Sequence, residues 1–290
     1  QDEKDLILNF KYNDYDAKYV LKNASPETFN EVLSEFRHSI NDDVTNKRDA
    51  VVKTFLKAIK LWPKANPSDI WSLIISRIYQ DPYNHPATEV DRDFAQSWKR
   101  TSGWALEEIF VDHYKAELEK SGILIGIFQK ENKVDLLKKM KLNYAVEPNK
   151  ADVLLVNTKK GKFDCFGVVH VKASIAERRQ NDQNFSMALL NKNFFSPFMT
   201  MDCKSFPSKY PLNKGELGEN KSRKVDKRND KRKEFEEEGY FSACFSYNSN
   251  TKQTPEGQKA TSRIYKMNFR NSKDMFTQMT IQARNRLYGG

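Results

Sequence analysis

Apolar residues recur at helical spacing through most of the first ninety residues of the chain. One such face carries Phe29, Val32 and Phe36, and it follows a proline at position 26, which suits the start of a helix. The same periodicity predicts three successive helices, at residues 26–36, 51–61 and 67–78. Residues 1–90 are therefore predicted to form a helical N-terminal subdomain.

Beyond residue 90, helical and strand-like patterns alternate. A long helix is predicted at residues 93–120 and a last amphipathic helix at residues 272–287. The elements predicted between them are a short strand or helix at 122–129, a basic helix at 131–141, a helix at 186–190, and strands at 240–247 and 264–269. This alternation indicates an α/β fold, so residues 91–290 are predicted to form the core of the protein.

The most informative pattern is a pair of apolar runs, at residues 151–156 and 165–172. They predict a β-hairpin whose turn centre lies near Lys160-Gly161. Asp152 precedes this turn by eight residues and Lys172 follows it by eleven, so both fall near the open end of the hairpin. A carboxylate that can hold Mg²⁺ and a lysine beside it are the minimum parts for phosphodiester hydrolysis. The simpler alternative is that each charge merely ends its strand and reaches water.

The chain carries a basic excess on a background rich in both signs of charge. Its 290 residues include 49 Lys and Arg against 39 Asp and Glu, which gives a net charge of +10. This balance favours a polyanionic partner.

Residues 204–238 differ in composition from the rest of the chain. Between residues 221 and 233 there are eight basic and two acidic residues, and four Glu follow within the next five positions. The favoured interpretation is a charged, solvated and mobile insertion whose charges neutralise each other. The alternative is a clamp that becomes ordered on a DNA backbone.

The cysteine and hydropathy patterns indicate the compartment. Cys165, Cys203 and Cys244 show neither a Cys-x-x-Cys motif nor a Cys/His spacing typical of zinc sites. Their odd number favours reduced thiols in a cytoplasmic protein. No apolar run approaches the length that spans a bilayer and no signal peptide opens the chain, so no membrane partner is expected.

Three segments together resemble the type II restriction endonucleases of the PD-(D/E)XK fold, and especially their CCGG-cutting group. The segments are residues 47–79, 97–108 and 166–187. The likeness covers most of residues 45–190, weakens after residue 239 and leaves residues 204–238 outside it. It implies a restriction-endonuclease-like core, with a central mixed β-sheet flanked by helices, in a bacterial or archaeal cytoplasm.

The resemblance also implies roles at the open end of the hairpin. Asp152 resembles the central metal-binding Asp of the fold, and Lys172 resembles its catalytic Lys. The acid that the family usually carries two residues before that Lys is absent, because His170 stands there. The CCGG group often has a Glu twelve residues after the Lys, where this chain has Asn184. The second metal-binding carboxylate must therefore come from elsewhere.

Glu107 is the first choice for that carboxylate, because it resembles the helical Glu that supports the metal site of this fold. The adjacent Glu108 ranks below it, and Glu147 is a weaker candidate. Glu107 and the central Asp are thus predicted to hold Mg²⁺, while Lys172 orients or deprotonates the attacking water and offsets charge in the transition state. His170 is predicted to act beside the metal as a neutral donor, and a strand-end His without a role is an equally open alternative.

Residues just past the catalytic Lys are predicted to contact DNA. The CCGG group often has an Arg-acid-Arg cluster there, and this chain has Glu177, Arg178 and Arg179, with Ala176 in place of the first Arg. Glu accepts from cytosine N4, and Arg donates to guanine O6 and N7 in the major groove. Ser174 belongs to the same predicted DNA-binding set. The alternative is an ion-pair cluster on the surface.

The resemblance and the residues together predict a type II site-specific deoxyribonuclease that uses Mg²⁺ to cut both strands of a short palindromic, CCGG-like DNA site. Two cuts related by two-fold symmetry require two active sites, so a homodimer is expected. A DNA methyltransferase is the expected functional partner. Two alternatives stay open: a repair, nicking or mobile-element nuclease of the same fold, and a non-catalytic nucleic-acid-binding protein with a decayed site.

Overall fold

The computed structural model describes residues 5–87, 93–142, 147–175, 179–204, 206–219 and 224–289. Its centre is a six-stranded mixed sheet with the strand order β3-β4-β5-β6-β7-β8. The strands are β3 (Ile123–Gly126), β4 (Val153–Asn157), β5 (Asp164–Lys172), β6 (Phe198–Thr200), β7 (Cys244–Ser246) and β8 (Ile264–Lys266). Strands β3 to β5 pair antiparallel and strands β5 to β8 pair parallel.

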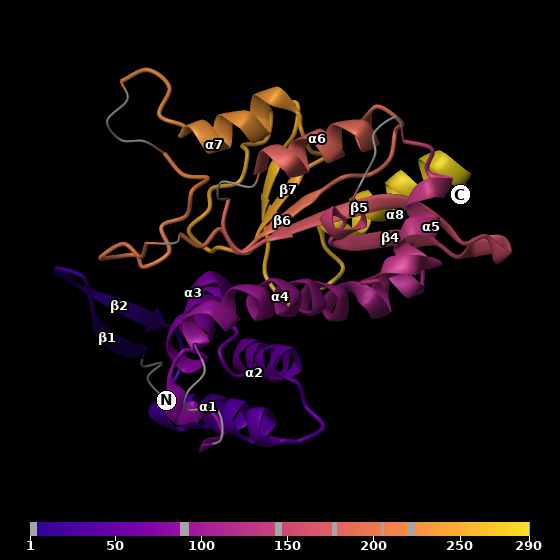
Figure 1. Cartoon of the computed structure of the whole chain (residues 1–290). Coiled ribbons are helices and arrows are strands. Elements are labelled where there is room, and N and C mark those ends of the chain that lie inside the picture. Colours follow the sequence, from indigo (N-terminus) through magenta and orange to yellow (C-terminus); the bar gives the residue numbers. More distant parts are fainter. Residues whose placement is uncertain are drawn as a thin grey trace.

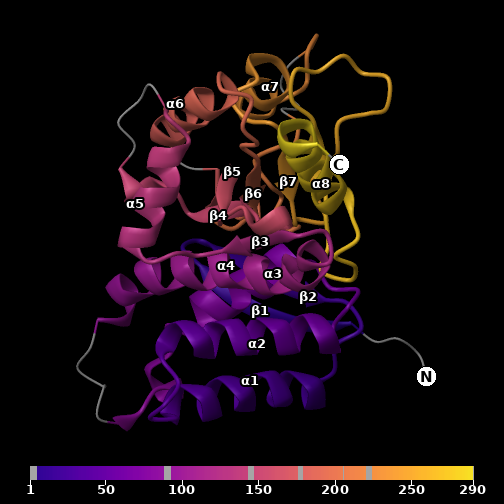
Figure 2. The same cartoon turned by 90° about the vertical axis from the view of Figure 1, so that its right-hand side faces the viewer.

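Helices cover both faces of this sheet, with α4 on one side and α6 on the other (Figures 1 and 2). The helices around the sheet are α4 (Phe94–Glu119), α5 (Lys130–Lys139), α6 (Arg179–Leu190) and α8 (Met275–Tyr288). Alternate residues of β4 enter two different buried clusters: Val153 and Leu155 pack on the α4 side, and Leu154 and Val156 pack on the α5 and α6 side. This two-sided burial explains why the hairpin strands are continuous apolar runs.

The three predicted N-terminal helices are present as α1 (Pro26–Asn41), α2 (Lys47–Leu61) and α3 (Pro67–Leu73), and α3 continues into the π-helical turn η1 (Ile74–Ile78). Phe55 of α2 packs between Trp71 and Phe269, with ring centroids 5.9 and 5.3 Å apart. The N-terminal helices and the sheet therefore share one hydrophobic core. The domain boundary near residue 90 stays a prediction.

The prediction that the N-terminal region is helical throughout is wrong for its first segment. Residues 6–21 form an antiparallel hairpin of β1 (Leu6–Tyr12) and β2 (Tyr15–Leu21), with Asn13 in its turn at a φ of 48°. Along β1, half-buried and exposed side chains alternate, which is the two-residue period of a strand. The many polar residues between them obscured this alternation in the sequence.

The segment at 204–238 is better ordered than its composition indicated. It contains α7 (Asp230–Lys233), which continues into the π-helical turn η6 (Glu234–Glu238). Arg232 and Glu236 are only 4% and 1% exposed, and they form an ion pair of 2.8 Å. The prediction of a solvated, mobile insertion is therefore wrong for this part of the segment, because its charges neutralise each other inside the fold.

Smaller differences concern the parallel half of the sheet. Strand β6 was not predicted, and strands β7 and β8 are shorter than the residue ranges predicted for them.

All three cysteines are buried free thiols. In the described part of the chain, no helix has both the length and the apolar character needed to cross a membrane.

Candidate active site

Asp152 and Lys172 meet at the open end of the β4–β5 hairpin. The ammonium Nζ of Lys172 donates to the carboxylate Oδ2 of Asp152 at 2.7 Å. The hairpin turn, η5 (Lys159–Gly161), lies at the opposite end of the two strands. The structure thus brings together the two residues that the spacing of the sequence predicted to be neighbours.

The backbone of the hairpin fixes this pair. Val153 pairs with Val169, so Asp152 directly precedes the paired part of β4 and faces the last residues of β5. Its Oδ2 also accepts a hydrogen bond from the backbone N–H of Val171 at 2.8 Å. On the preceding residue, the carbonyl of Ala151 accepts from Nζ of Lys133, at 2.6 Å. Asp152 is therefore oriented by the backbone as well as by Lys172.

Asp182, on the first turn of α6, is the second carboxylate beside Lys172. Its Oδ2 lies 3.5 Å from the Lys172 Nζ, which makes this contact an ion pair rather than a hydrogen bond. The Asp182 side chain is buried, and burial raises its pKa above the usual value, although the Lys172 charge opposes this shift. Sequence reasoning missed this residue.

Glu107 reaches the same site from α4. Burial, followed by the negative charge of Asp152, raises the pKa of the Glu107 carboxyl, while Lys172 and Lys133 act in the opposite direction. A buried carboxyl whose pKa is raised by a neighbouring carboxylate is typical of a site that binds a cation or works by acid–base chemistry. Glu107 is thus electrostatically coupled to the pair on the hairpin.

The two other acidic candidates have different partners. Glu108 lies 3.9 Å from the guanidinium of Arg48 on α2. Glu147 is largely exposed and pairs with Lys150 at 3.6 Å. In this arrangement neither of them contacts the Asp152–Lys172 pair.

The neighbouring acids stabilise the positive charge of Lys172. Burial alone would lower the pKa of its ammonium group, but Asp152, Asp182 and Glu107 together outweigh burial and raise it. Lys172 therefore stays protonated at neutral pH, which suits it to stabilising negative charge rather than to accepting a proton.

His170 lies away from this group of side chains. Its ring is fully buried, 3.0 Å from the Ser196 hydroxyl and packed edge-on against Phe185 and Phe241. Burial lowers the pKa of His170 to about 3, so the ring is neutral. The contacts of His170 are those of a core residue, and the structure does not bring it to the carboxylates.

The predicted DNA-contacting residues are described only in part. Glu177 and Arg178 lie outside the described residues, and Arg179 begins α6 without a described side chain. Ser174 lines a cavity next to the hairpin end. The backbone N–H of the next residue, Ile175, donates to Oε2 of Glu216 at 2.9 Å, so the 204–238 segment holds the chain where it leaves β5.

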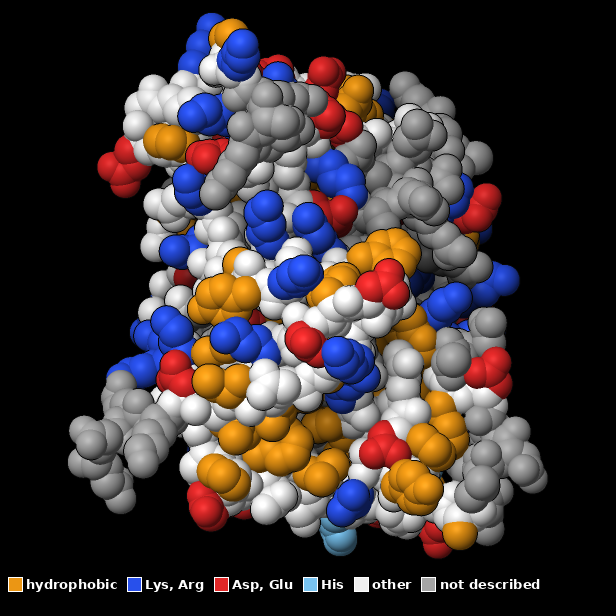
Figure 3. All heavy atoms as spheres, turned by 90° about the vertical axis from the view of Figure 1, so that its left-hand side faces the viewer, with side chains coloured by type: hydrophobic (Ala, Val, Ile, Leu, Met, Phe, Trp, Pro, Cys, Tyr) orange, Lys and Arg blue, Asp and Glu red, His pale blue; other side chains and the backbone are white. Residues whose placement is uncertain are grey.

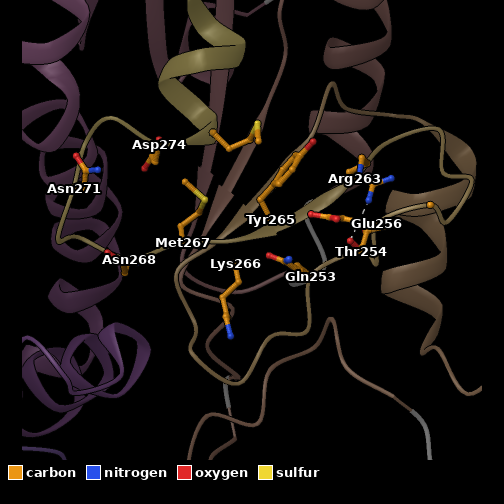
Figure 4. Close-up of a pocket in the computed structure, with 12 residues that line it drawn as sticks. Gln253, Thr254, Glu256, Arg263, Tyr265, Lys266, Met267, Asn268, Asn271 and Asp274 are labelled. Atoms are coloured by element: carbon orange, nitrogen blue, oxygen red, sulfur yellow. Dashed lines mark hydrogen bonds between the residues drawn. The ribbon is translucent and has the colours of Figure 1, made fainter.

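A cavity of about 610 Å³ at the edge strand β8 contains none of these residues (Figure 4). One of its walls carries Asp274, whose carboxylate caps α8 by accepting from the backbone N–H of Phe276 and also accepts from the Tyr114 hydroxyl at 2.7 Å. Since this carboxylate is occupied by contacts within the fold, the candidate active site remains the hairpin end.

The donor set at the hairpin end fits a hard divalent cation. In the described part of the chain, no group of three or more His, Cys, Asp or Glu side chains is arranged so that it could hold a metal ion. However, Asp152, Glu107 and Asp182 are all oxygen donors, which Mg²⁺ prefers. The Asp182 Oδ2 is buried beside the Lys172 ammonium group, whereas Glu107 and Asp152 repel each other. A cation between Glu107 and Asp152 would relieve that repulsion.

Two residues of this site were absent from the sequence-based set, Asp182 and Lys133. Asp182 lies ten residues after Lys172, whereas the family pattern directed attention to position 184. An acid in the first turn of the helix after β5 was the available signal. Lys133 gave no comparable signal, because it is one of several lysines in a basic helix.

Known proteins are similar to this chain over most of its length. The model of the family described as BsaWI restriction endonuclease type 2 matches residues 128–273. The type II restriction enzyme AgeI of Thalassovita gelatinovora is 33% identical over 273 residues, which cover 91% of this chain and 94% of that enzyme. The crystal structure of a specific AgeI–DNA complex is 31% identical, covers 96% of this chain and 99% of that chain, and has a TM-score of 0.82.

The mixed sheet flanked by helices is that of the restriction-endonuclease-like enzymes. The chain belongs to the BsaWI family of type II restriction endonucleases, and it is a site-specific deoxyribonuclease. The resemblance in the sequence is confirmed, and it extends further than predicted, since the family match runs through residues 204–238. Restriction endonucleases generally use a divalent metal ion.

Proposed function

We propose that this endonuclease uses Mg²⁺ to cut both strands of a short palindromic DNA site that contains C:G pairs and is CCGG-like. The observation that carries the proposal is the 2.7 Å contact between Asp152 and Lys172, with Glu107 and Asp182 beside it. The DNA complex of its relative AgeI supports double-stranded DNA as the substrate.

In the proposed site, Asp152, Glu107 and a backbone carbonyl near Val171 would hold the metal ion. When bound, Mg²⁺ supplies Lewis-acid activation of the phosphate and lowers the pKa of a water molecule. Lys172 presents its ammonium group to the phosphate and offsets the negative charge that grows in the transition state. Asp182 holds the Lys172 ammonium group in place from α6. Because the group is already ordered, the reaction does not include the entropic cost of ordering it.

In this proposal, the residues that follow Lys172 recognise the bases of the DNA site. Glu177 accepts from cytosine N4, Arg178 donates to the guanine edge, and Arg179 and Ser174 complete the contact. Because a palindromic site has two-fold symmetry, two copies of the chain bind it and each cuts one strand. A DNA methyltransferase of the same specificity protects the host's own sites.

Cleavage of mixed plasmid DNA tests the proposal. With Mg²⁺ the purified chain should give discrete fragments whose ends map to one short palindrome, and EDTA should stop the reaction. Nicks or smears would point to a repair or nicking nuclease, and binding without cleavage would point to a decayed site.

The variant Lys172→Met should reduce cleavage by about 10³-fold or more, because transition-state charge is left uncompensated, while Mg²⁺-free DNA binding persists. Lys139→Met is the matched control, because Lys139 lies on α5 and donates to the carbonyl of Phe163. If Lys172→Met cleaves at the wild-type rate, the assignment of the active site is wrong.

A further inference from the structure

A cavity of about 540 Å³ lies beside the candidate active site, between the β1–β2 hairpin and the chain that leaves β5. Its walls come from five parts of the fold. These are the hairpin (residues 10–13 and 19), residues 71–80 of α3, η1 and the turn after it, Trp98 of α4, residues 173–174 after β5, and Cys203, Lys204 and Pro207 after β6. Since Ser174 is two residues beyond Lys172, this wall lies within about 7 Å of the reacting end of the strand, as measured along the backbone.

The charge of this cavity has one sign. Lys11, Arg77 and Lys204 contribute to its lining, and no Asp or Glu does so among the described residues that line it. Hydroxyl and amide groups supply further hydrogen-bond donors, from Ser76 and Gln80 among others. In a chain with 39 acidic residues, a concave surface without any of them favours an anionic ligand.

The three cations are available for such a ligand. The guanidinium carbon of Arg77 lies 4.0 Å from the centroid of the Phe10 ring, and the group also interacts with the Tyr19 hydroxyl, so its position is restrained. Among the described residues, neither Arg77 nor Lys204 has a carboxylate within 4.0 Å. Lys11 pairs with Asp16 at 3.0 Å, but both side chains are more than three-quarters exposed, and such pairs contribute little stability. A phosphate could therefore replace Asp16.

The walls of the cavity are held in place by contacts within the fold. The Tyr15 hydroxyl donates to the carbonyl of Pro207, and the Tyr12 and Phe206 rings pack edge to face with centroids 6.5 Å apart. Deeper in the wall, the Ser68 hydroxyl lies 3.0 Å from the thiol of Cys203. The hairpin is thus fastened to the segment that follows β6, so the cavity exists before any ligand binds.

Figure 3 shows the face of the molecule on which the hairpin lies. Lys and Arg side chains are spread across the middle and upper parts of this face, with acidic side chains interspersed among them. The hairpin therefore lies on a face where Lys and Arg side chains are numerous, which suits a polyanionic partner.

We propose that this cavity binds the sugar–phosphate backbone of double-stranded DNA that flanks the cleaved bond. The inference rests on the proposed function and names a second contact surface, formed by the N-terminal hairpin and η1. Two of the three cations are lysines, whose ammonium groups attract phosphates without the planar geometry that distinguishes bases. Contacts of this kind set affinity and position, and they do not select sequence.

The test compares Lys11→Gln, Arg77→Gln, Lys204→Gln and the triple variant by DNA-binding titration at several salt concentrations, without Mg²⁺. Each single variant should reduce the slope of log Kd against log salt by about one, and the triple variant should weaken binding by at least about tenfold. The loss should be the same, within about twofold, for a duplex with the target site and for an unrelated duplex.

Lys120→Gln is the matched control, and it should bind DNA like the wild type. Lys120 is exposed, pairs with Glu117, and follows the far end of α4, about 33 Å along the helix axis from Trp98 in the cavity wall. Thermal unfolding of each variant checks that the fold is intact.

Two results would overturn the inference. Unchanged salt slopes in all three variants would mean that the cavity does not contact DNA, and a loss confined to the target duplex would mean that it reads bases. Cleavage by the wild-type chain is measured separately. If the wild type cuts one defined site while the variants bind normally, only this inference fails, and the proposed function stands.

Discussion

Asp182 Oδ2 lies 3.5 Å from the Nζ of Lys172, although the two residues belong to different elements. Helix α6 turns back over the end of β5 and carries its first-turn acid to the lysine. The Lys172 ammonium group therefore lies between two acids, Asp152 on the hairpin and Asp182 on the helix. This position restrains the lysine side chain, and the ammonium group stays positively charged.

Replacing Asp182 tests that restraint. Asp182→Asn removes one of the two anions that hold the Lys172 ammonium group, and we expect the single-turnover cleavage rate to fall by about tenfold or more. Asn184→Ala is the control, because position 184 is exposed on the same helix. Equal rates for Asp182→Asn and the wild type would show that Asp152 alone is sufficient.

Neighbouring glutamates on α4 provide a second comparison. Glu107→Gln removes a proposed metal ligand, so the Mg²⁺ concentration for half-maximal cleavage should rise by about tenfold or more. Glu108→Gln changes the same functional group one residue away, on a side chain directed toward Arg48, and should leave that concentration unchanged. If the two variants exchange these effects, Glu108 is the ligand.

Buried Asp69 makes the stability of the fold depend on pH. Burial raises its pKa from 3.8 to about 6, despite hydrogen bonds from Asn213 and Asn66. The folded state therefore holds a proton that the unfolded chain releases, and the free energy of unfolding should fall as pH rises from about 4 to about 6.5. Asp69→Asn should remove roughly 2–3 kcal/mol of that fall.

Urea denaturation at pH 4.5 and pH 7.5 measures the effect of Asp69→Asn. The substitution keeps the acceptor oxygen that Asn213 uses at 2.7 Å, so the local contacts are preserved. An equal difference between the two pH values in the wild type and the variant would show that Asp69 does not retain its proton in the fold.

Breaking the buried ion pair of the 204–238 segment should strongly destabilise the fold. Glu236→Gln leaves Arg232 with an uncompensated charge in a buried site, which should cost about 3–5 kcal/mol. Glu237→Gln is the control, since Glu237 pairs with Arg228 at the surface and should cost less than about 1 kcal/mol. Both values come from denaturant titration, and similar costs would mean that the pair is not effectively buried.

The parts of the site that could be predicted are those set by local geometry. A hairpin with apolar strands fixes which residues meet at its open end, so Asp152 and Lys172 followed from spacing alone. Asp182 did not, because its position depends on how the chain turns between β5 and α6. No periodicity encodes that turn.

The fold shows the same division between local and long-range information. Amphipathic helices such as α2 follow from their periodicity, whereas β1 carries so many polar residues that its alternation was obscured. The charge run near Arg232 was misjudged for a related reason. Composition gives the number of charges, but their burial depends on partners such as the carbonyl groups of Lys252 and Gln253, far along the chain.

The hydrogen bond from the Ile175 amide to Glu216 bears on attempts to redesign target preference. A loop transplanted over residues 174–179 keeps this bond only if it brings a backbone N–H to the same place, and Ile175 is buried, with 1% of its surface exposed. A buried amide donor without its acceptor would lower the stability of the fold by about 1–3 kcal/mol, and the grafted loop would no longer be held in position. If this loop reads bases as proposed, a replacement for it must leave β5 along the path that keeps the amide at position 175 beside Glu216.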